Sequence, residues 1–130
     1  MMNDQEKAIL ERPNFAHLAT LNPDGSPHVA PVWYDLHGEE IWINTARGRV
    51  KERNIAKDPR VALSVHDQEN PYSMVSVQGE VSEVTEEGAI EHIDALAKRY
   101  LGKDEYPYKS PDEQRVIIKI VPRKVASMLS

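Results

Sequence analysis

Short apolar runs separated by turn residues dominate this sequence, and they limit the folds that it can adopt. Six of the runs have the length and the β-branched content of strands. In the fifth run, Val75, Val77 and Gly79 fall on one face of the expected strand. A glycine in the middle of a strand predicts a bend or a bulge, which a sheet needs in order to close into a barrel. The six expected strands cover residues 15–21, 28–36, 40–45, 60–66, 73–84 and 115–121.

Only one long segment has helical spacing. Apolar residues recur every three or four positions from Ala89 to Tyr100, and Gly102 follows as a left-handed helix end. Shorter helices are expected over residues 4–11 and 49–57, each ended by a proline that follows it. No composition shift marks a boundary, so residues 1–130 are expected to form a single domain. The pattern predicts a mainly β fold with short helices, built as a six-stranded antiparallel barrel.

Composition and charge narrow the partners that are expected for this chain. It has no cysteine, which excludes disulfides, thiolate metal sites and a cysteine nucleophile. Its net charge of -5 disfavours nucleic-acid binding, which depends on neutralising phosphates. The first residues lack the apolar segment of a signal peptide, and no apolar run is long enough to cross a bilayer, so we expect a cytoplasmic protein with no membrane partner. Large aromatic side chains on the expected strands favour a homodimer interface; they are Trp33, Tyr34 and Trp42.

Four cationic side chains lie within seven residues, between an expected strand and an expected helix. They are Arg47, Arg49, Lys51 and Arg53. A basic loop at the N-terminus of a helix favours anions, because exposed amide N–H groups and the helix dipole add to the side-chain charge. The stretch is interpreted as the phosphate site of a cofactor, and a solvated charged turn is the alternative.

The sequence has no pattern for catalysis by a metal or by a protein nucleophile. Its five histidines lie far apart and show no ligand spacing, so no metal site is expected. Ser26 and Ser73 lie in no nucleophile-elbow motif. A cofactor that performs the chemistry itself needs neither kind of group, and the protein then supplies binding and orientation. No catalytic residue is therefore assigned.

The order of several short motifs resembles that of a known family. The motifs occupy residues 19–29, 43–54, 58–64 and 70–81. Together they make the chain similar to the pyridoxamine-phosphate-oxidase-like split β-barrel superfamily. Within it, the chain most resembles the probable F420-dependent enzymes of the flavin/deazaflavin oxidoreductase B group. The resemblance implies an FMN-binding, PNPOx-like split β-barrel that forms a homodimer, with the cofactor in a cleft between the subunits.

The resemblance also implies which residues contact the cofactor. Arg49 and Lys51 match the positions that hold the cofactor phosphate, and Asn54 matches a position near the cofactor tail. The remaining matches concern the ring and its immediate surroundings. They are Pro31, Val32 and Trp33 along the ring, Asn44 and Thr45 beside the ring and the ribityl chain, and Tyr72, Ser73 and Met74 from the partner subunit.

Two departures from the family pattern argue against pyridoxal phosphate synthesis. True pyridoxamine phosphate oxidases tend to have adjacent arginine and lysine residues where this chain has Val50 and Lys51. The chain also lacks their C-terminal signature for the substrate phosphate.

The resemblance implies a coenzyme F420-dependent oxidoreductase that transfers a hydride between the cofactor and a small electron-poor organic substrate. An FMN-binding oxidoreductase of the same fold and a non-catalytic flavin or deazaflavin carrier are the alternatives. The basic cluster is wider than one phosphate needs, which favours F420, because the F420 tail carries carboxylates beyond its phosphate. Tyr106 and Tyr108 either close over the substrate or belong to a surface loop, and Trp33 either stacks near the ring or packs in a dimer core.

Overall fold

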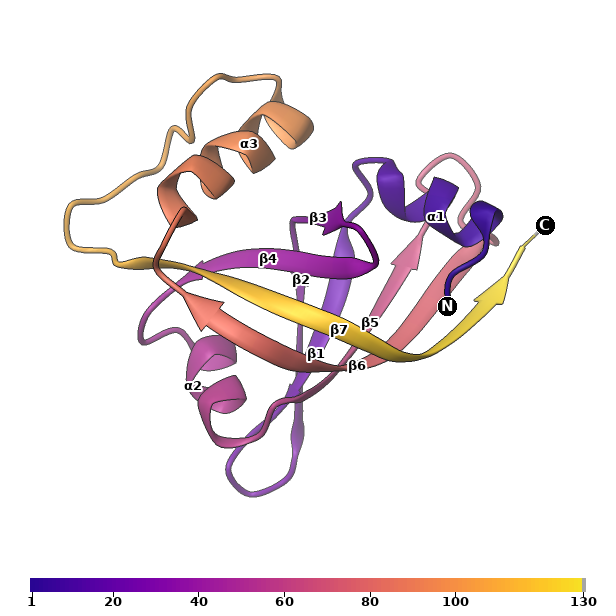
Figure 1. Cartoon of the computed structure of the whole chain (residues 1–130), viewed down its shortest axis with the longest axis horizontal. Coiled ribbons are helices and arrows are strands. Elements are labelled where there is room, and N and C mark those ends of the chain that lie inside the picture. Colours follow the sequence, from indigo (N-terminus) through magenta and orange to yellow (C-terminus); the bar gives the residue numbers. More distant parts are fainter. Residues whose placement is uncertain (130) are drawn as a thin grey trace.

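The computed structural model describes residues 1–129, which form a mainly β structure with three short helices (Figure 1). Figure 1 shows α3 at one end of the molecule, and α1, the N-terminus and the end of β7 at the other. In chain order the elements are α1 (Asp4–Glu11), β1 (Ala16–Leu21), β2 (Pro27–Val32), β3 (Tyr34–His37), β4 (Glu40–Ala46), α2 (Val50–Lys57), β5 (Arg60–His66), β6 (Met74–Thr85), α3 (Ala89–Leu101) and β7 (Arg115–Met128).

A single antiparallel sheet organises these elements, in the order β2-β1-β5-β6-β7-β4-β3. Its two edge strands, β2 and β3, are neighbours in the chain and are separated only by Trp33. One residue spans less than about 4 Å of chain, so the two edges of the sheet must come together at this point. The sheet therefore curls into a barrel that is split at Trp33, as the expected split β-barrel requires.

The structure has seven strands between residues 1 and 129, so the expectation of six was wrong. The expected strand over residues 28–36 is in fact β2 and β3, which pair with β1 and β4 on opposite edges of the sheet. The backbone N–H of Tyr34 donates to an acceptor outside the sheet, Oη of Tyr100, at 3.2 Å. This contact comes from a helix far along the chain, so no local pattern indicated the break.

The last strand also runs further than expected, because β7 continues past Pro122 to Met128. Pro122 lies opposite Gly79, where the pairing register shifts, so the missing N–H falls at an irregular point of the ladder. A Cβ atom at Gly79 would lie 2.6 Å from the carbonyl oxygen of Val121, which only glycine tolerates. The predicted irregularity at Gly79 is confirmed, and it lets a long strand bend around the barrel.

Alternating residues of the strands fill the interior of the curled sheet. The helix α1 covers one end of this core with Ile9 and Leu10, and α2 adds Ile55. No helix of the described residues has the length and the apolar character that a membrane crossing requires. The buried strand residues of the core are Ala16, Leu18, Tyr34, Ile41, Ile43, Val61, Leu63, Val65, Val75, Val77, Ile118 and Ile120.

One arginine of α3 joins the split in the barrel to the end of α1. The guanidinium of Arg99 donates to the carbonyl oxygens of Leu10, Glu11, Arg12 and Tyr34, at distances from 2.6 to 3.1 Å. Three of these carbonyls lie at the C-terminus of α1, where helical acceptors have no partner within the helix and a cation is favoured. Arg99 therefore fixes α1, β3 and α3 relative to one another.

Replacing Arg99 by Met should lower the free energy of unfolding by about 2–3 kcal/mol, because several carbonyl groups lose a charged donor together. Urea unfolding followed by circular dichroism measures the change. Lys98→Met is the matched control, since Lys98 is exposed on the same helix and, among residues 1–129, pairs only with Asp104. An Arg99 variant that loses no more stability than the Lys98 variant would contradict this role.

Candidate cofactor cleft

A cleft of about 500 Å³ opens beside the split in the barrel. Its walls come from the junction of β2 and β3, the end of β4, the start of α2, one face of α3 and the loop that follows α3. Seven of the eleven residues expected to contact a cofactor line this one cleft, although they come from three separate segments. The lining residues are Phe15, Pro31, Val32, Trp33, Asn44, Thr45, Arg49, Lys51, Ile93, Leu96, Tyr106, Tyr108 and Arg115.

Positive charge exceeds negative charge in this cleft. Arg49 and Arg115 both pair with the carboxylate of Glu113, Arg115 at 3.0 Å. Lys51 forms no hydrogen bond or ion pair with any of the residues that the structure describes. Three cations against one carboxylate leave a local charge of +2. A cavity of about 480 Å³ on the outer face of the sheet differs, because both of its arginines already have carboxylate partners.

Burial, together with Arg49 and Arg115, lowers the pKa of Lys51. The free protein therefore disfavours the charged form of this lysine, and a bound anion would relieve that cost. Burial alone would raise the pKa of Glu113, but hydrogen bonds from Arg115 and Arg49 lower it overall. The cleft thus keeps an ionised carboxylate between two arginines and leaves the ammonium group of Lys51 for a ligand.

Arg115 was missing from the residues expected to contact a cofactor. It is the first residue of β7, and its side chain is only 8% exposed. Its Nε donates to Oδ1 of Asn44 at 2.9 Å, and its guanidinium lies 5.4 Å from the ring centre of Tyr106. Its Nη2 has no partner among residues 1–129, and none of their buried polar side-chain atoms lacks a partner, so Nη2 keeps some exposure in a residue that lines the cleft. No sequence signal marked Arg115, since its contact with Asn44 spans 71 positions.

Aromatic rings form another part of the cleft wall and pack behind it. Tyr100 stacks between Phe15 and Trp33, with ring centres 5.7 and 5.1 Å apart, and Tyr106 meets Trp33 edge-on at 6.0 Å. The loop that carries Tyr106 is anchored to α3, because its backbone N–H donates to Asp94 at 2.8 Å. A flat ring has apolar surface to pack against on this wall. Tyr106 therefore belongs to the cleft wall.

Comparisons with known proteins agree with this architecture. The sequence profile of the family described as pyridoxamine 5'-phosphate oxidase matches residues 2–129. The chain belongs to this family. The resemblance inferred from the order of the motifs is thereby confirmed at the level of the family.

Individual members of the pyridoxamine 5'-phosphate oxidase family and solved structures give the degree of similarity. A pyridoxine/pyridoxamine 5'-phosphate oxidase of Rhodopseudomonas palustris (strain BisB5) is 31% identical over 128 residues. That match covers 95% of this chain but only 59% of the relative, so the chain spans about three fifths of its length. A solved structure described as an F420 reductase is 34% identical and has a TM-score of 0.85. The match covers 96% of this chain and 98% of the chain in that structure. The solved structure of a conserved hypothetical protein of Mycobacterium tuberculosis is 28% identical and has a TM-score of 0.76. That match covers 98% of this chain and 85% of the other.

Four residues expected to contact the cofactor lie away from the cleft in this family member. Asn54 is buried on α2, where its amide donates to Oγ1 of Thr20 and Oδ1 of Asn22, each at 3.0 Å, and so ties α2 to the end of β1. The segment of Tyr72, Ser73 and Met74 lies at the start of β6. Met74 pairs there with Met128, the last residue of β7, whereas Arg115 in the cleft is the first residue of that strand.

The other residues of the basic stretch are used within the protein or lie elsewhere. Arg47 pairs with Glu52 at 3.6 Å and with Glu86 at 3.3 Å. Glu52 also accepts the backbone N–H of Gly48 at 2.8 Å, so a carboxylate of the chain already occupies this amide near the start of α2. Arg53 lies beside a separate cavity, formed by α2 and the turn after β1. The cationic residues of this stretch that line the cleft are therefore Arg49 and Lys51.

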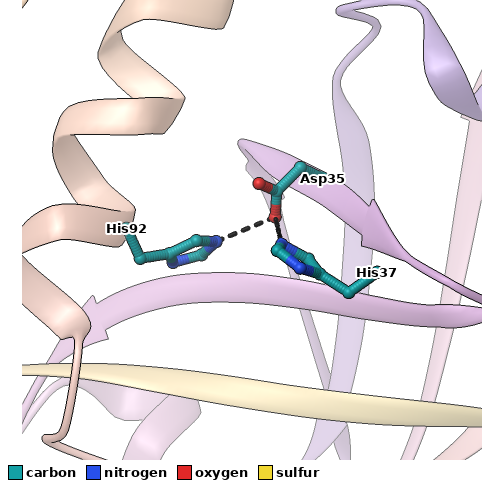
Figure 2. A group of neighbouring side chains, drawn as sticks. All are labelled: Asp35, His37 and His92. Carbon is teal, nitrogen blue, oxygen red and sulfur yellow. Dashed lines mark hydrogen bonds and ion pairs between the residues drawn. The ribbon is translucent and has the colours of Figure 1, made fainter.

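A second polar cluster adjoins the cleft behind Asn44. Figure 2 shows His92 from α3 and His37 from the end of β3 directed at the carboxylate of Asp35. Nε2 of His92 lies 2.8 Å from Oδ1 of Asp35, and Nε2 of His37 lies 3.1 Å from the same oxygen. The three possible ligand atoms lie within 4.8 Å of one another, a grouping that sequence spacing did not indicate. In the free protein these contacts hold both rings against the carboxylate of Asp35.

Replacing Lys51 by Met should raise the melting temperature of the free protein by about 1–3 °C, the shift for a few tenths of a kcal/mol in a chain of this size. The reason is the lowered pKa of Lys51, since at pH 7 its charge opposes folding. The gain in melting temperature should shrink as the pH rises, first through the pKa of Lys51 in the folded protein and then through its pKa in the unfolded chain. Calorimetry without phosphate or sulfate measures it.

Lys57→Met is the matched control for this measurement. Lys57 is exposed in the last turn of the same helix, where a cation favours the helix dipole, so its replacement should not raise the melting temperature. Equal shifts in the two variants would contradict the account of Lys51.

Proposed function

We propose that this chain binds a flavin-type cofactor in the cleft, coenzyme F420 in preference to FMN, and acts as an oxidoreductase on a small electron-poor organic molecule. When bound, such a cofactor supplies hydride transfer. The observation that carries the proposal is the ammonium group of Lys51, which has no partner among residues 1–129 and lines the same cleft as the cationic Arg49 and Arg115. A basic cleft with an aromatic wall suits a ligand that has both a phosphate and a flat ring.

Each part of the cleft has a role in this proposal. Lys51, Arg49 and Arg115 hold the cofactor phosphate, because charge-assisted hydrogen bonds are the strong ones for such a group. The segment Pro31–Trp33 and Thr45 set the position of the ring, and Asn44 holds Arg115 beside it. Trp33 and Tyr106 exclude water from one side of it. No side chain is assigned to proton transfer.

One observation supports F420 over FMN. The solved structure described as an F420 reductase matches nearly the whole of both chains at 34% identity. FMN remains the alternative cofactor, and a non-catalytic flavin or deazaflavin carrier is the alternative function.

The proposal includes a second copy of the chain. Tyr72 is 76% exposed, and it begins a segment at the opposite end of β7 from the cleft. Tyr72, Ser73 and Met74 can therefore reach a cofactor only if a partner subunit presents them to the cleft of its neighbour. We accordingly propose a cytoplasmic homodimer whose other partner is its small-molecule substrate. A monomeric mass in sedimentation at micromolar concentration would contradict the dimer.

Titration of the apo-protein with FMN and with oxidised F420, followed by fluorescence, tests the choice of cofactor. The proposal expects F420 to bind at micromolar concentration or below, and more tightly than FMN. Tighter binding of FMN would favour the alternative cofactor. Binding of neither would overturn the proposal of a flavin-type cofactor.

Lys51→Ala should weaken cofactor binding by about 1.5–3 kcal/mol, the scale of a charge-assisted hydrogen bond. Arg115→Gln should weaken it to a similar degree. Arg53→Ala is the control, because Arg53 is on the same helix as Lys51 but outside the cleft. The same fluorescence titration measures all three affinities, and an unchanged affinity in the Lys51 variant would exclude the phosphate assignment.

A further inference from the structure

The side-chain amide of Asn44 links the cleft to the cluster of Asp35, His37 and His92. Its Oδ1 accepts from Nε of Arg115 at 2.9 Å. Its Nδ2 donates to the carbonyl oxygen of Ala89 at 2.8 Å and lies 3.1 Å from Nδ1 of His92. Both hydrogens of the amide are thereby used inside the protein. Asn44 therefore holds Arg115 and has little hydrogen-bonding capacity left for a ligand.

The partners of Asn44 allow only one orientation of its amide. Turning the amide over would set its Nδ2 against the donor of Arg115 and its Oδ1 against the carbonyl oxygen of Ala89. In the observed orientation Nδ2 can only donate, so Nδ1 of His92 must accept. A neutral imidazole that accepts at Nδ1 carries its proton on Nε2. Nε2 donates that proton to Oδ1 of Asp35, which lies 2.8 Å from Nε2.

The carboxylate of Asp35 is in turn held on the side away from the cleft. His37 lies 3.1 Å from the same oxygen and stacks on Trp42, with ring centres 3.6 Å apart. His92 is buried and does not line the cleft, and its hydrogen-bonded contact with a cleft residue, among residues 1–129, is the one with Asn44. The contacts form one chain, from Asp35 through His92 and Asn44 to Arg115.

We propose that His92 is a positioning residue for the anion site: held by Asp35, it fixes the Asn44 amide that aims Arg115 into the cleft. This inference rests on the proposed function for its effect on cofactor binding, but the positioning itself is a property of the free protein. It assigns the cluster beside the cleft a role in binding, although none of its three side chains lines the cleft.

Two conservative variants test the roles of the two ring nitrogens of His92 separately. An asparagine at this position offers its amide oxygen near the place of Nδ1, and so keeps an acceptor for Asn44. A glutamine reaches the place of Nε2, and so keeps the contact with Asp35 but removes the acceptor. His92→Gln should therefore weaken binding of F420 or FMN about tenfold, the scale of one lost hydrogen bond, whereas His92→Asn should stay within about twofold.

The positioning is also measured without any cofactor. In ¹H–¹⁵N spectra of the free protein, the Nε–H signal of Arg115 should exchange slowly with water in the wild type and in His92→Asn, and about tenfold faster in His92→Gln. His37→Ala is the matched control, because His37 contacts Asp35 but not Asn44, and it should leave this signal and the affinity unchanged. Equal exchange rates in both His92 variants would overturn the proposal.

One further measurement needs no variant. Long-range ¹H–¹⁵N spectra of wild-type His92 should show the proton on Nε2, and a proton on Nδ1 would overturn the proposal even if His92→Gln fails to fold. If neither F420 nor FMN binds the wild type, the proposed function fails, while the Arg115 exchange rate and the His92 tautomer still decide the positioning.

Discussion

The connection through Trp33 is the constraint on which the rest of the structure depends. Two strands at opposite edges of a seven-stranded sheet are separated by this one residue, so the sheet must curl until its edges meet. The backbone groups released at the split are satisfied from α3, by Tyr100 for the N–H of Tyr34 and by Arg99 for its carbonyl oxygen. The curling of the sheet also places the segment Pro31–Trp33 beside the cleft, so closing the barrel builds one wall of the site.

The charged part of the cleft depends on how its side chains are paired. Glu113 draws Arg49 and Arg115 together, and Asn44 fixes Arg115 from the other side. Lys51 then has two cations near it and no partner among residues 1–129, and burial, followed by the charges of Arg49 and Arg115, lowers its pKa. A bound anion would offset the cost of the charged form of Lys51, so the stability of the free protein and the affinity for a ligand are opposed at this lysine.

Local patterns predicted the parts of the fold that local physics decides. The helix over residues 4–11 and the strand over residues 60–66 have the expected bounds, and the irregularity at Gly79 was expected from one glycine in a strand. The break at Trp33 and the course of β7 past Pro122 escaped prediction, because contacts from distant segments decide them. In the cleft, motif order indicated Arg49 and Lys51, while Arg115 and His92 depend on partners 71 and 48 positions from them.

A crystal structure of the protein with F420 or FMN, whichever binds more tightly, tests the central claim most directly. The account predicts the cofactor phosphate within about 3.2 Å of Nζ of Lys51 and of the Arg115 guanidinium, with the ring beside Trp33. A phosphate bound at Arg53 or on the outer face of the sheet near Arg60, with Lys51 left to solvent, would contradict it.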